Sequence, residues 1–387
     1  MDLQNLKKKF SSRFNTEEKD IRVYFSPGRV NLIGEHTDYN GGYVFPCALT
    51  FGTTLLVKEN HKNIFRFATT NFDVTADISI KPPFIKAGKE WYYYPLGVID
   101  QFNKMGISFR GLDFLFSGDI PNGAGLSSSA SIEMVTAFAL NDIFSVKESM
   151  ISLVKLSQKA ENQFIGVNCG IMDQFAVGMG SLNMAIFLNC ANLNYELVPL
   201  VIKGHKLIIS NTNKRRGLAD SKYNERRAEC DTAVENLSQV KKINNLSEVS
   251  YARFLEINDM ITNPVIRRRA KHVISENQRV LDAIVALKAG NLDAFGQLMN
   301  ASHDSLRDDY EVTGIELDTM VEEARKIPGV LGSRMTGAGF GGCTVSLVQE
   351  DSVDEFIEQV AIGYLEKTGL KADFYVAGVG DGTKRVE

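Results

Sequence analysis

The chain has 387 residues, of which 44% are hydrophobic, and a formal net charge of −4 at pH 7. Its length and apolar content suffice for two domains with substantial cores, whereas the acidic balance argues against a nucleic-acid or membrane-surface partner. No apolar run approaches the ~20 residues that a membrane-spanning helix needs. Five scattered cysteines fit neither a disulfide framework nor a zinc site, so we expect reduced thiols and a cytoplasmic location.

The first half of the chain predicts short strands and then helices. Apolar residues alternate with polar ones in the strands, and they recur at three- and four-residue steps in the helices. The predicted strands are residues 22–25, 30–33, 43–45, 53–57, 64–68, 77–80 and 111–116, and the predicted helices are residues 96–105, 130–144 and 147–164.

The second half predicts a β-rich piece, a long helical stretch and a strand-rich end. The predicted strands are residues 206–210, 343–348 and 372–377; the β-rich piece covers residues 184–200, and helices cover most of 219–310 and 353–367. This order favours an α+β fold over a doubly wound parallel sheet. We divide the chain into an N-terminal domain of residues 1–195 and a C-terminal domain of residues 196–387, with the boundary near 190–205.

A polar stretch, residues 26–42, is richer in functional groups than a hairpin requires. Within it Glu35, His36 and Asp38 offer acceptors and a donor suited to paired hydrogen bonds with sugar hydroxyls. Carboxylates and one histidine on a short loop are a poor ligand set for a transition metal. A surface loop with satisfied polar groups is the alternative. Arg29 adds a permanent positive charge for a phosphate or a developing alkoxide.

Small residues at positions 121–131, Pro-Asn-Gly-Ala-Gly-Leu-Ser-Ser-Ser-Ala-Ser, join a predicted strand to a predicted helix. Such a loop presents backbone N–H groups at the first turn of a helix, where an anion is favoured. Gly123 and Gly125 allow its backbone to approach that anion closely. An ordinary connection with Ser127 or Ser128 as an N-cap is the alternative. The chain contains no Walker lysine and no protein-kinase signature.

A second glycine-rich loop, Gly337 to Gly342, satisfies the pattern G-x-G-x-x-G. A dinucleotide fingerprint must follow a strand and open a helix, but this loop leads into a predicted strand. We therefore reject the dinucleotide interpretation and expect the loop to pack against a ligand or against the first glycine-rich loop.

Three motifs together resemble those of a known family. Residues 26–46 are similar to the galactokinase signature over its whole length, and residues 123–131 resemble the phosphate-loop motif of the GHMP small-molecule kinases. Arg334-Met-Thr-Gly-Ala-Gly-Phe-Gly-Gly-Cys343 resembles the third motif of that superfamily. The motifs occur in the expected order, and the likeness covers nearly the full chain. Only the first motif is specific to the galactokinase branch.

The resemblance implies an ATP-dependent kinase that phosphorylates D-galactose on its anomeric C1 hydroxyl, giving galactose 1-phosphate and ADP. It implies the two-domain α+β GHMP kinase fold, in which an N-terminal domain like the second domain of ribosomal protein S5 joins a ferredoxin-like C-terminal domain, with the active site in the cleft. ATP and Mg²⁺ would be required, and we expect a monomer.

The resemblance also implies site residues, position by position. Asp173 is similar to the family's catalytic carboxylate and Arg29 to its partner. The implied galactose-binding residues are Glu35, His36, Asp38 and Tyr223; the implied ATP-binding residues are Gly123, Ala124, Gly125, Leu126, Ser127, Ser128, Ser129, Ala130 and Trp91; and the implied Mg²⁺ ligands are Ser128 and Glu161. From the residues alone, Asp173 equally fits a helix N-cap or loop carboxylate, and Glu161 an ordinary surface glutamate.

We expect Asp173 to take the proton of the sugar hydroxyl, and Arg29 to stabilise the forming alkoxide and the γ-phosphoryl charge. Two competing interpretations are a related sugar-1-kinase, such as an N-acetylgalactosamine kinase, and a non-catalytic sensor that binds galactose and ATP. The intact serine-rich loop, together with Arg29 and Asp173, favours the enzyme.

Overall fold

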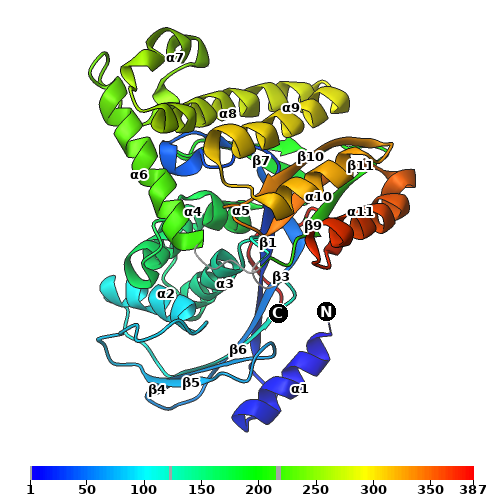
Figure 1. Ribbon diagram of the computed structural model, residues 1–387. Helices are drawn as coiled ribbons and strands as arrows, with labels where there is room; N and C mark the ends of the chain where they lie inside the picture. Colours follow the sequence, from blue (N-terminus) through cyan, green and yellow to red (C-terminus); the bar gives the residue numbers. More distant parts are fainter. Residues whose placement is uncertain (1, 122–123, 215–218) are drawn as a thin grey trace.

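The computed structural model describes residues 2–121, 124–214 and 219–387, with the backbone alone for 219–221. Its described strands form three sheets, of six, four and three strands. Figure 1 shows the largest sheet in the lower part of the molecule and the helices of the second half in the upper part.

The six-stranded sheet has the order β13-β1-β3-β6-β4-β5, and its neighbours are antiparallel except for β4 and β6. These strands are β1 (Arg22–Asn31), β3 (Pro46–Glu59), β4 (Ile64–Thr69), β5 (Ala76–Ser79), β6 (Leu112–Gly118) and β13 (Lys384–Arg385). A three-stranded sheet lies beside it, formed by β2 (Tyr43–Val44), β7 (Met184–Asn189) and β8 (Tyr195–Pro199).

Both faces of the large sheet are covered because apolar residues alternate between two cores. Leu55 of β3 and Phe114 of β6 belong to the main N-terminal core, whereas Leu56 of β3 and Leu115 of β6 pack with α1 (Leu3–Phe14). Residues next to each other in a strand point to opposite faces. The helices over the main core are α2 (Tyr93–Lys104), α3 (Ser128–Ile143), α4 (Met150–Ala160) and α5 (Met172–Met179).

The four-stranded sheet has the antiparallel order β10-β11-β9-β12. Its elements are β9 (His205–Asn211), α10 (Ile315–Arg325), β10 (Val330–Thr336), β11 (Cys343–Gln349), α11 (Val353–Thr368) and β12 (Asp373–Ala377). A β-α-β-β-α-β chain order with this sheet order is the ferredoxin-like arrangement. Between β9 and α10 lie α6 (Ala219–Leu237), α7 (Tyr251–Ile257), α8 (Pro264–Lys288) and α9 (Leu292–Ser305), which form the upper layer in Figure 1.

Most predicted elements are confirmed, with a few informative differences. The strands predicted at 22–25 and 30–33 are one strand, β1, whose register shifts between Pro27 and Arg29. The helix predicted at 147–164 is α4 followed by a π-helical turn, Glu161–Ile165. Helices α1, α5 and α10 and strands β10 and β13 were not predicted. None of the described helices is long and apolar enough to cross a bilayer.

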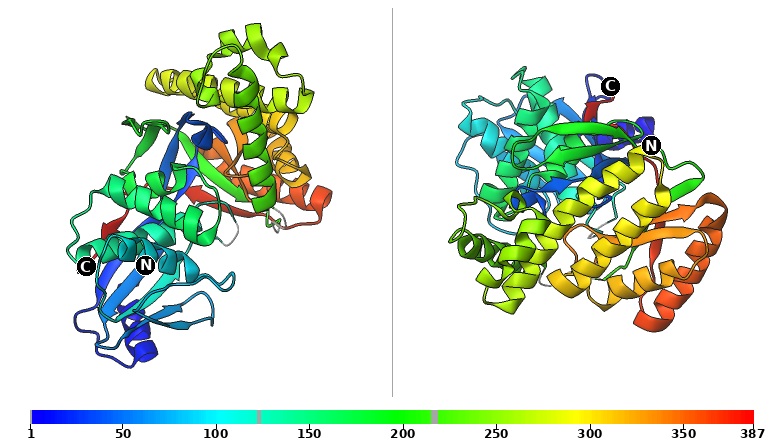
Figure 2. Two further views of the ribbon diagram at one scale, coloured as in Figure 1. Left: turned by 90° about the vertical axis from the view of Figure 1, so that its left-hand side faces the viewer. Right: turned by 90° about the horizontal axis from the view of Figure 1, so that it is seen from above.

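The end of the chain returns to the first sheet. Strand β13 pairs with β1, and Lys7 of α1 forms an ion pair with Glu387. The two termini lie near each other in all views (Figures 1 and 2). The five cysteines are free thiols, as expected.

Candidate active site

Arg29 joins the first two motifs. Its Nε and Nη2 contact Asp173 Oδ1 at 2.9 and 2.8 Å, and its Nη1 donates to the carbonyl oxygen of Gly125 at 2.7 Å. The Arg29 side chain is 4% exposed, so this charge is held in one place. The register shift in β1 precedes Arg29, and its backbone N–H bonds to the Leu126 carbonyl at 3.2 Å. Strand β1 leads into residues 32–42, which we call the sugar-type loop. The strand therefore lies directly against residues 121–131, the serine-rich loop.

The third motif meets the second at the same point. Gly337 has φ +85°, and a Cβ there would lie 2.9 Å from the carbonyl oxygen of Gly125. The two glycine-rich loops are therefore in contact, as one of the two sequence-based alternatives expected. The loop after Gly337 connects two antiparallel strands, β10 and β11, which confirms that it is no dinucleotide fingerprint.

The serine-rich loop ends at the first turn of α3. Ser127 occupies the N-cap position with φ 62°, but its side chain makes no capping hydrogen bond. Within the described residues its buried hydroxyl has no hydrogen-bond partner. The first-turn N–H groups are therefore not satisfied by Ser127, as an ordinary capped connection would require, and they fit a bound anion.

The other residues that the resemblance implies for ATP binding differ in how they could contact a nucleotide. Ala124, Leu126 and Ala130 are buried in the apolar cores, so only their backbone could take part, while Ser128 and Ser129 are half-buried. Gly123 lies outside the described residues. Trp91 is half-buried, donates from Nε1 to the Val74 carbonyl at 3.1 Å and packs edge-on against Phe116 of β6.

The sugar-type loop follows β1, and its side chains are held by the second half of the chain. Glu35 is 1% exposed, and its Oε1 accepts from the Gly337 N–H at 2.8 Å and from Arg334 Nη1 at 3.3 Å. Arg334 is itself fully buried and also donates to the carbonyls of Asn31 and Leu32. These bonds orient the carboxylate of Glu35.

His36, Tyr39, Tyr223 and Tyr310 form one aromatic cluster. The ring of His36 lies 5.7 Å from that of Tyr223 and 4.8 Å from that of Tyr310, and Tyr39 lies 5.2 Å from Tyr223. The Tyr39 hydroxyl bonds to His36 Nδ1 at 2.8 Å and to the Tyr310 hydroxyl at 2.7 Å. The structure thus brings Tyr223, from α6, to the sugar-type loop.

Polar groups beside this cluster remain available to a ligand. His36 Nε2 is buried and has no hydrogen-bond partner among the described residues. Burial, and then the charge of His272, lowers the pKa of His36 to about 3, and a contact with the Ala338 backbone opposes this shift only in part, so the ring is neutral near pH 7. A neutral imidazole nitrogen with no partner can exchange a hydrogen bond with a hydroxyl.

Asp38 lies at the edge of a cavity of about 480 Å³ that Tyr39 and Gly170 also line. Burial, and then the nearby charge of Asp173, raises the pKa of Asp38 to about 7. A Cβ on Gly170 would lie 1.8 Å from Asp38 Oδ2, so only glycine leaves room for this carboxylate. Asp38 is therefore close enough to Asp173 to interact with its charge, and it also faces a cavity that Asp173 does not line.

Glu161 is buried, so the alternative of an ordinary surface glutamate is wrong. Its carboxylate accepts from Gln174 Nε2 at 2.6 Å, and the same amide donates to Glu133 at 3.0 Å. Burial, together with the charge of Asp173, raises the pKa of Glu161 to about 7. Asp173 is the second residue of α5 and does not cap it, because Ile171 is the N-cap residue.

This arrangement can be compared with the needs of Mg²⁺, which prefers oxygen ligands and keeps several waters. No group of three or more His, Cys, Asp or Glu side chains suited to a metal occurs in the part of the chain described. The Glu161 carboxylate is, however, hydrogen-bonded by Ser129 from the first turn of α3 and lies near the charge of Asp173. Crowded carboxylates next to a serine-rich, phosphate-type loop fit a divalent cation shared with phosphate oxygens.

Sequence analysis missed several residues around the sugar-type loop. His272 and Glu276 of α8 and Tyr310 gave no local signal, because each lies in a helical stretch far from the motifs. Arg334 opens the third motif, and a buried arginine there could have been matched to a carboxylate such as Glu35. Gln174 is adjacent to Asp173, but nothing in its pattern indicates that it bridges two glutamates.

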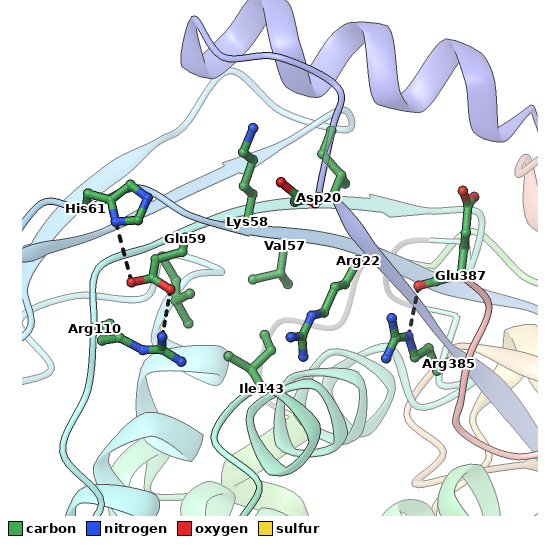
Figure 3. Close-up of a pocket in the computed structure, with 12 residues that line it drawn as sticks. Asp20, Arg22, Val57, Lys58, Glu59, His61, Arg110, Ile143, Arg385 and Glu387 are labelled. Atoms are coloured by element: carbon green, nitrogen blue, oxygen red, sulfur yellow. Dashed lines mark hydrogen bonds and ion pairs between the residues drawn. The ribbon is translucent and has the colours of Figure 1, made fainter.

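A cavity of about 580 Å³ lies where β1 begins and β3 ends, away from these residues (Figure 3). Its arginines are paired: Arg110 lies 2.9 Å from Glu59, and Arg22 and Arg385 lie 3.3 and 3.2 Å from Asp142. Because these charges are already compensated, the cavity does not indicate an anion site.

Comparisons with known proteins show which proteins this chain is similar to. Residues 8–59 match the galactokinase galactose-binding signature, residues 93–181 the GHMP kinases N terminal domain, and residues 283–365 the GHMP kinases C terminal domain. The chain is 55% identical to the galactokinase of Clostridium acetobutylicum, with 100% of each chain covered. It is 50% identical to the galactokinase of Bacillus subtilis, with 99% of each covered.

Two solved structures are similar to the fold. The galactokinase of Lactococcus lactis complexed with galactose superposes with a TM-score of 0.97 at 44% identity, and 100% of each chain is covered. The mevalonate kinase of Methanococcus jannaschii has a TM-score of 0.68 at 20% identity over 92% of this chain and 98% of that chain. The second likeness is one of fold alone.

Proposed function

The chain belongs to the galactokinase family, and on that premise we propose how its residues phosphorylate galactose. Its two-domain α+β GHMP kinase fold is as expected. The enzyme is a galactose kinase that uses ATP and gives galactose 1-phosphate and ADP. The observation that carries the proposal is the Arg29–Asp173 pair, which bonds to the serine-rich loop through Gly125.

Asp173 acts as the general base toward the anomeric hydroxyl. Both contacts from Arg29 reach Oδ1, so we assign the proton transfer to Oδ2. Arg29 stabilises the alkoxide as it forms and the charge on the transferred phosphoryl group. Its low exposure supports this role, since a fixed charge needs little reorganisation during the reaction.

Galactose is held by Glu35, His36, Asp38 and Tyr223. The orphan Nε2 of His36 and the carboxylate of Asp38 at the cavity edge support this assignment. Neutral and charged acceptors so close together can pair with successive sugar hydroxyls. Tyr223 closes the cluster from α6, next to the ring of His36.

ATP binds at the serine-rich loop, with its phosphates at the first turn of α3 and residues 124–130 around them. The role of Gly123 stays a prediction from the sequence. The positive φ and missing cap at Ser127 support this placement. Trp91 lies beside the adenine. Ser128 and Glu161 would hold Mg²⁺, which would neutralise phosphate charge when bound.

We also propose that the enzyme is a cytoplasmic monomer with no nucleic-acid or membrane partner. The five free thiols and the net charge of −4 support this proposal.

The Asp173→Asn variant tests the assignment of the base. We expect kcat to fall by about 10²- to 10⁴-fold, the usual contribution of a positioned base, because the amide cannot accept the proton. The dissociation constant for galactose, measured by calorimetry, should change by no more than about threefold. Asp142→Asn is the matched control, since Asp142 pairs with Arg22 and Arg385 at the far end of α3. A near-normal rate for Asp173→Asn would remove the assignment.

A further inference from the structure

Helix α8 forms hydrogen bonds with the backbone of Glu35 on both sides, at its N–H and at its carbonyl oxygen. Glu276 Oε1 accepts from the backbone N–H groups of Gly34 at 2.9 Å and Glu35 at 3.3 Å. His272 Nε2 lies 3.2 Å from the carbonyl oxygen of Glu35. His272 and Glu276 are four residues apart, so they share one face of the helix. Figure 1 shows α8 lying across the blue loop that follows β1.

The two helix residues are themselves fixed. Both are fully buried, and Glu276 also accepts from Ser302 at 2.6 Å and from Arg279 Nε at 2.7 Å. A carbonyl can only accept, so His272 carries its hydrogen on Nε2. Its Nδ1 lies 3.0 Å from the Ser305 hydroxyl, which also lies 3.0 Å from Asp309 Oδ2. A buried group held by partners of its own can position a loop without moving.

The held peptide sets the direction of two side chains of the sugar-type loop. Glu35 and His36 adjoin it, and His36 has φ 62°, a backbone conformation that a loop keeps only when its surroundings impose it. The Glu35 carboxylate is held by Arg334 and by the N–H of Gly337. Arg334 also lies 3.9 Å from Glu276, so the residues that hold the backbone and the side chain of Glu35 are linked to each other.

We propose that His272 and Glu276 are positioning residues for galactose, because they hold the peptide of Glu35 so that Glu35 and His36 face the sugar. This inference rests on the proposed galactose-binding role of Glu35 and His36. The two residues do not touch the substrate. Their loss should therefore weaken galactose recognition and leave the ATP side of the cleft intact.

Paired variants test the proposal. Glu276→Met removes the acceptor while keeping the length of the side chain, and Glu276→Gln keeps an oxygen for the two N–H groups. His272→Leu removes the donor, and His272→Gln keeps an N–H near the position of Nε2. The galactose KM, the ATP KM, kcat and Tm are measured for the purified full-length protein. Leu287→Ala is the control, because it creates a cavity near the C-terminal end of the same helix, eleven residues beyond Glu276.

We expect the galactose KM to rise about tenfold or more in Glu276→Met and His272→Leu, with the ATP KM changed by no more than about twofold. The glutamine variants should recover most of the loss. Leu287→Ala should lower Tm while leaving both KM values near those of the wild type. If Glu276→Met does not fold, the His272 pair decides the question alone.

The proposal is overturned if the galactose KM and the ATP KM rise together, or if the loss follows Tm across all variants including the control. It is also overturned if the glutamine variants are no better than the apolar ones. A Glu35→Ala variant separates the galactose-binding role of the loop from the positioning role of the helix. If its galactose KM is unchanged, the proposed role of the loop fails. If its galactose KM is raised while the His272 and Glu276 variants have normal values, only the positioning role is refuted.

Discussion

Two carboxylates of this site, Asp38 and Glu161, lie in surroundings that disfavour their charge. Asp38 illustrates the balance: burial and the charge of Asp173 raise its pKa from 3.8 to about 7, with Glu35 raising it further and the Tyr39 N–H and Arg29 opposing the shift. The folded protein therefore binds this proton more tightly than the unfolded chain does. Sugar binding benefits from the ionised acceptor, whereas folding favours the neutral acid.

The sign of this effect gives a prediction for Asp38→Asn. A raised folded-state pKa means that the stability from Asp38 is complete below pH 3.8 and is lost as the pH rises through about 7. Asparagine does not ionise, so the variant does not lose folding stability in this pH range. Its Tm should therefore exceed that of the wild type by about 2 °C or more at roughly pH 8, and by less at roughly pH 5. Differential scanning calorimetry at both values checks it.

The same variant should lose galactose affinity, measured by calorimetry, by about tenfold or more, because a directed acceptor is gone. A variant that is no more stable at the higher pH, or one that binds galactose as well as the wild type does, would show that this account of Asp38 is wrong.

At the level of elements, the site depends on one strand and two loops that meet. Strand β1 contributes Arg29, the loop before α3 contributes Gly125, and the loop after β10 contributes Gly337. Gly337 leaves too little room for a side chain beside the Gly125 carbonyl. The contact between the two glycine-rich loops thus fixes the position of Gly125, in the serine-rich loop, relative to Arg29.

Gly337→Ala tests this packing, and Gly369→Ala is its matched control. Both glycines have positive φ, +85° and +72°, but a Cβ at Gly369 would meet nothing within 4 Å. Each variant should lose about 1 kcal/mol of folding free energy from backbone strain. Only Gly337→Ala should also raise the ATP KM, by roughly tenfold, because it displaces the Gly125 carbonyl. Equal ATP KM values in the two variants would contradict the packing role.

On the scale of the whole molecule, the site is assembled from both halves of the chain. We keep the division into residues 1–195 and 196–387 as a proposal, with the addition that β13 returns to pair with β1. The fully buried Arg334 and Glu276 come from the second half and bond to the loop of the first. The sugar-type loop is therefore correctly shaped only when the two halves are packed together.

The sequence predicted those parts of the structure in which the interacting residues are close together along the chain. The loops at 26–42 and 121–131 were recognisable because their functional groups are contiguous, and β-strand alternation indicated most of the sheet. The bonds from His272 and Glu276 to residues more than 200 positions away leave no local pattern. Helix α1 was missed because its apolar residues Leu6, Phe10 and Phe14 are few within a basic segment. Their packing partners are on a face of the large sheet, in other parts of the sequence.

The most direct measurement is ADP production with ATP and Mg²⁺ against a panel of D-galactose, N-acetylgalactosamine, D-glucose, L-arabinose, mevalonate and homoserine. Strong turnover with galactose alone is the expected result, because Glu35, His36 and Asp38 recognise that sugar and Asp173 activates its anomeric hydroxyl. Galactose binding without ADP release would contradict the account in favour of a sensor, and faster turnover of another substrate would contradict the role assigned to the sugar-type loop.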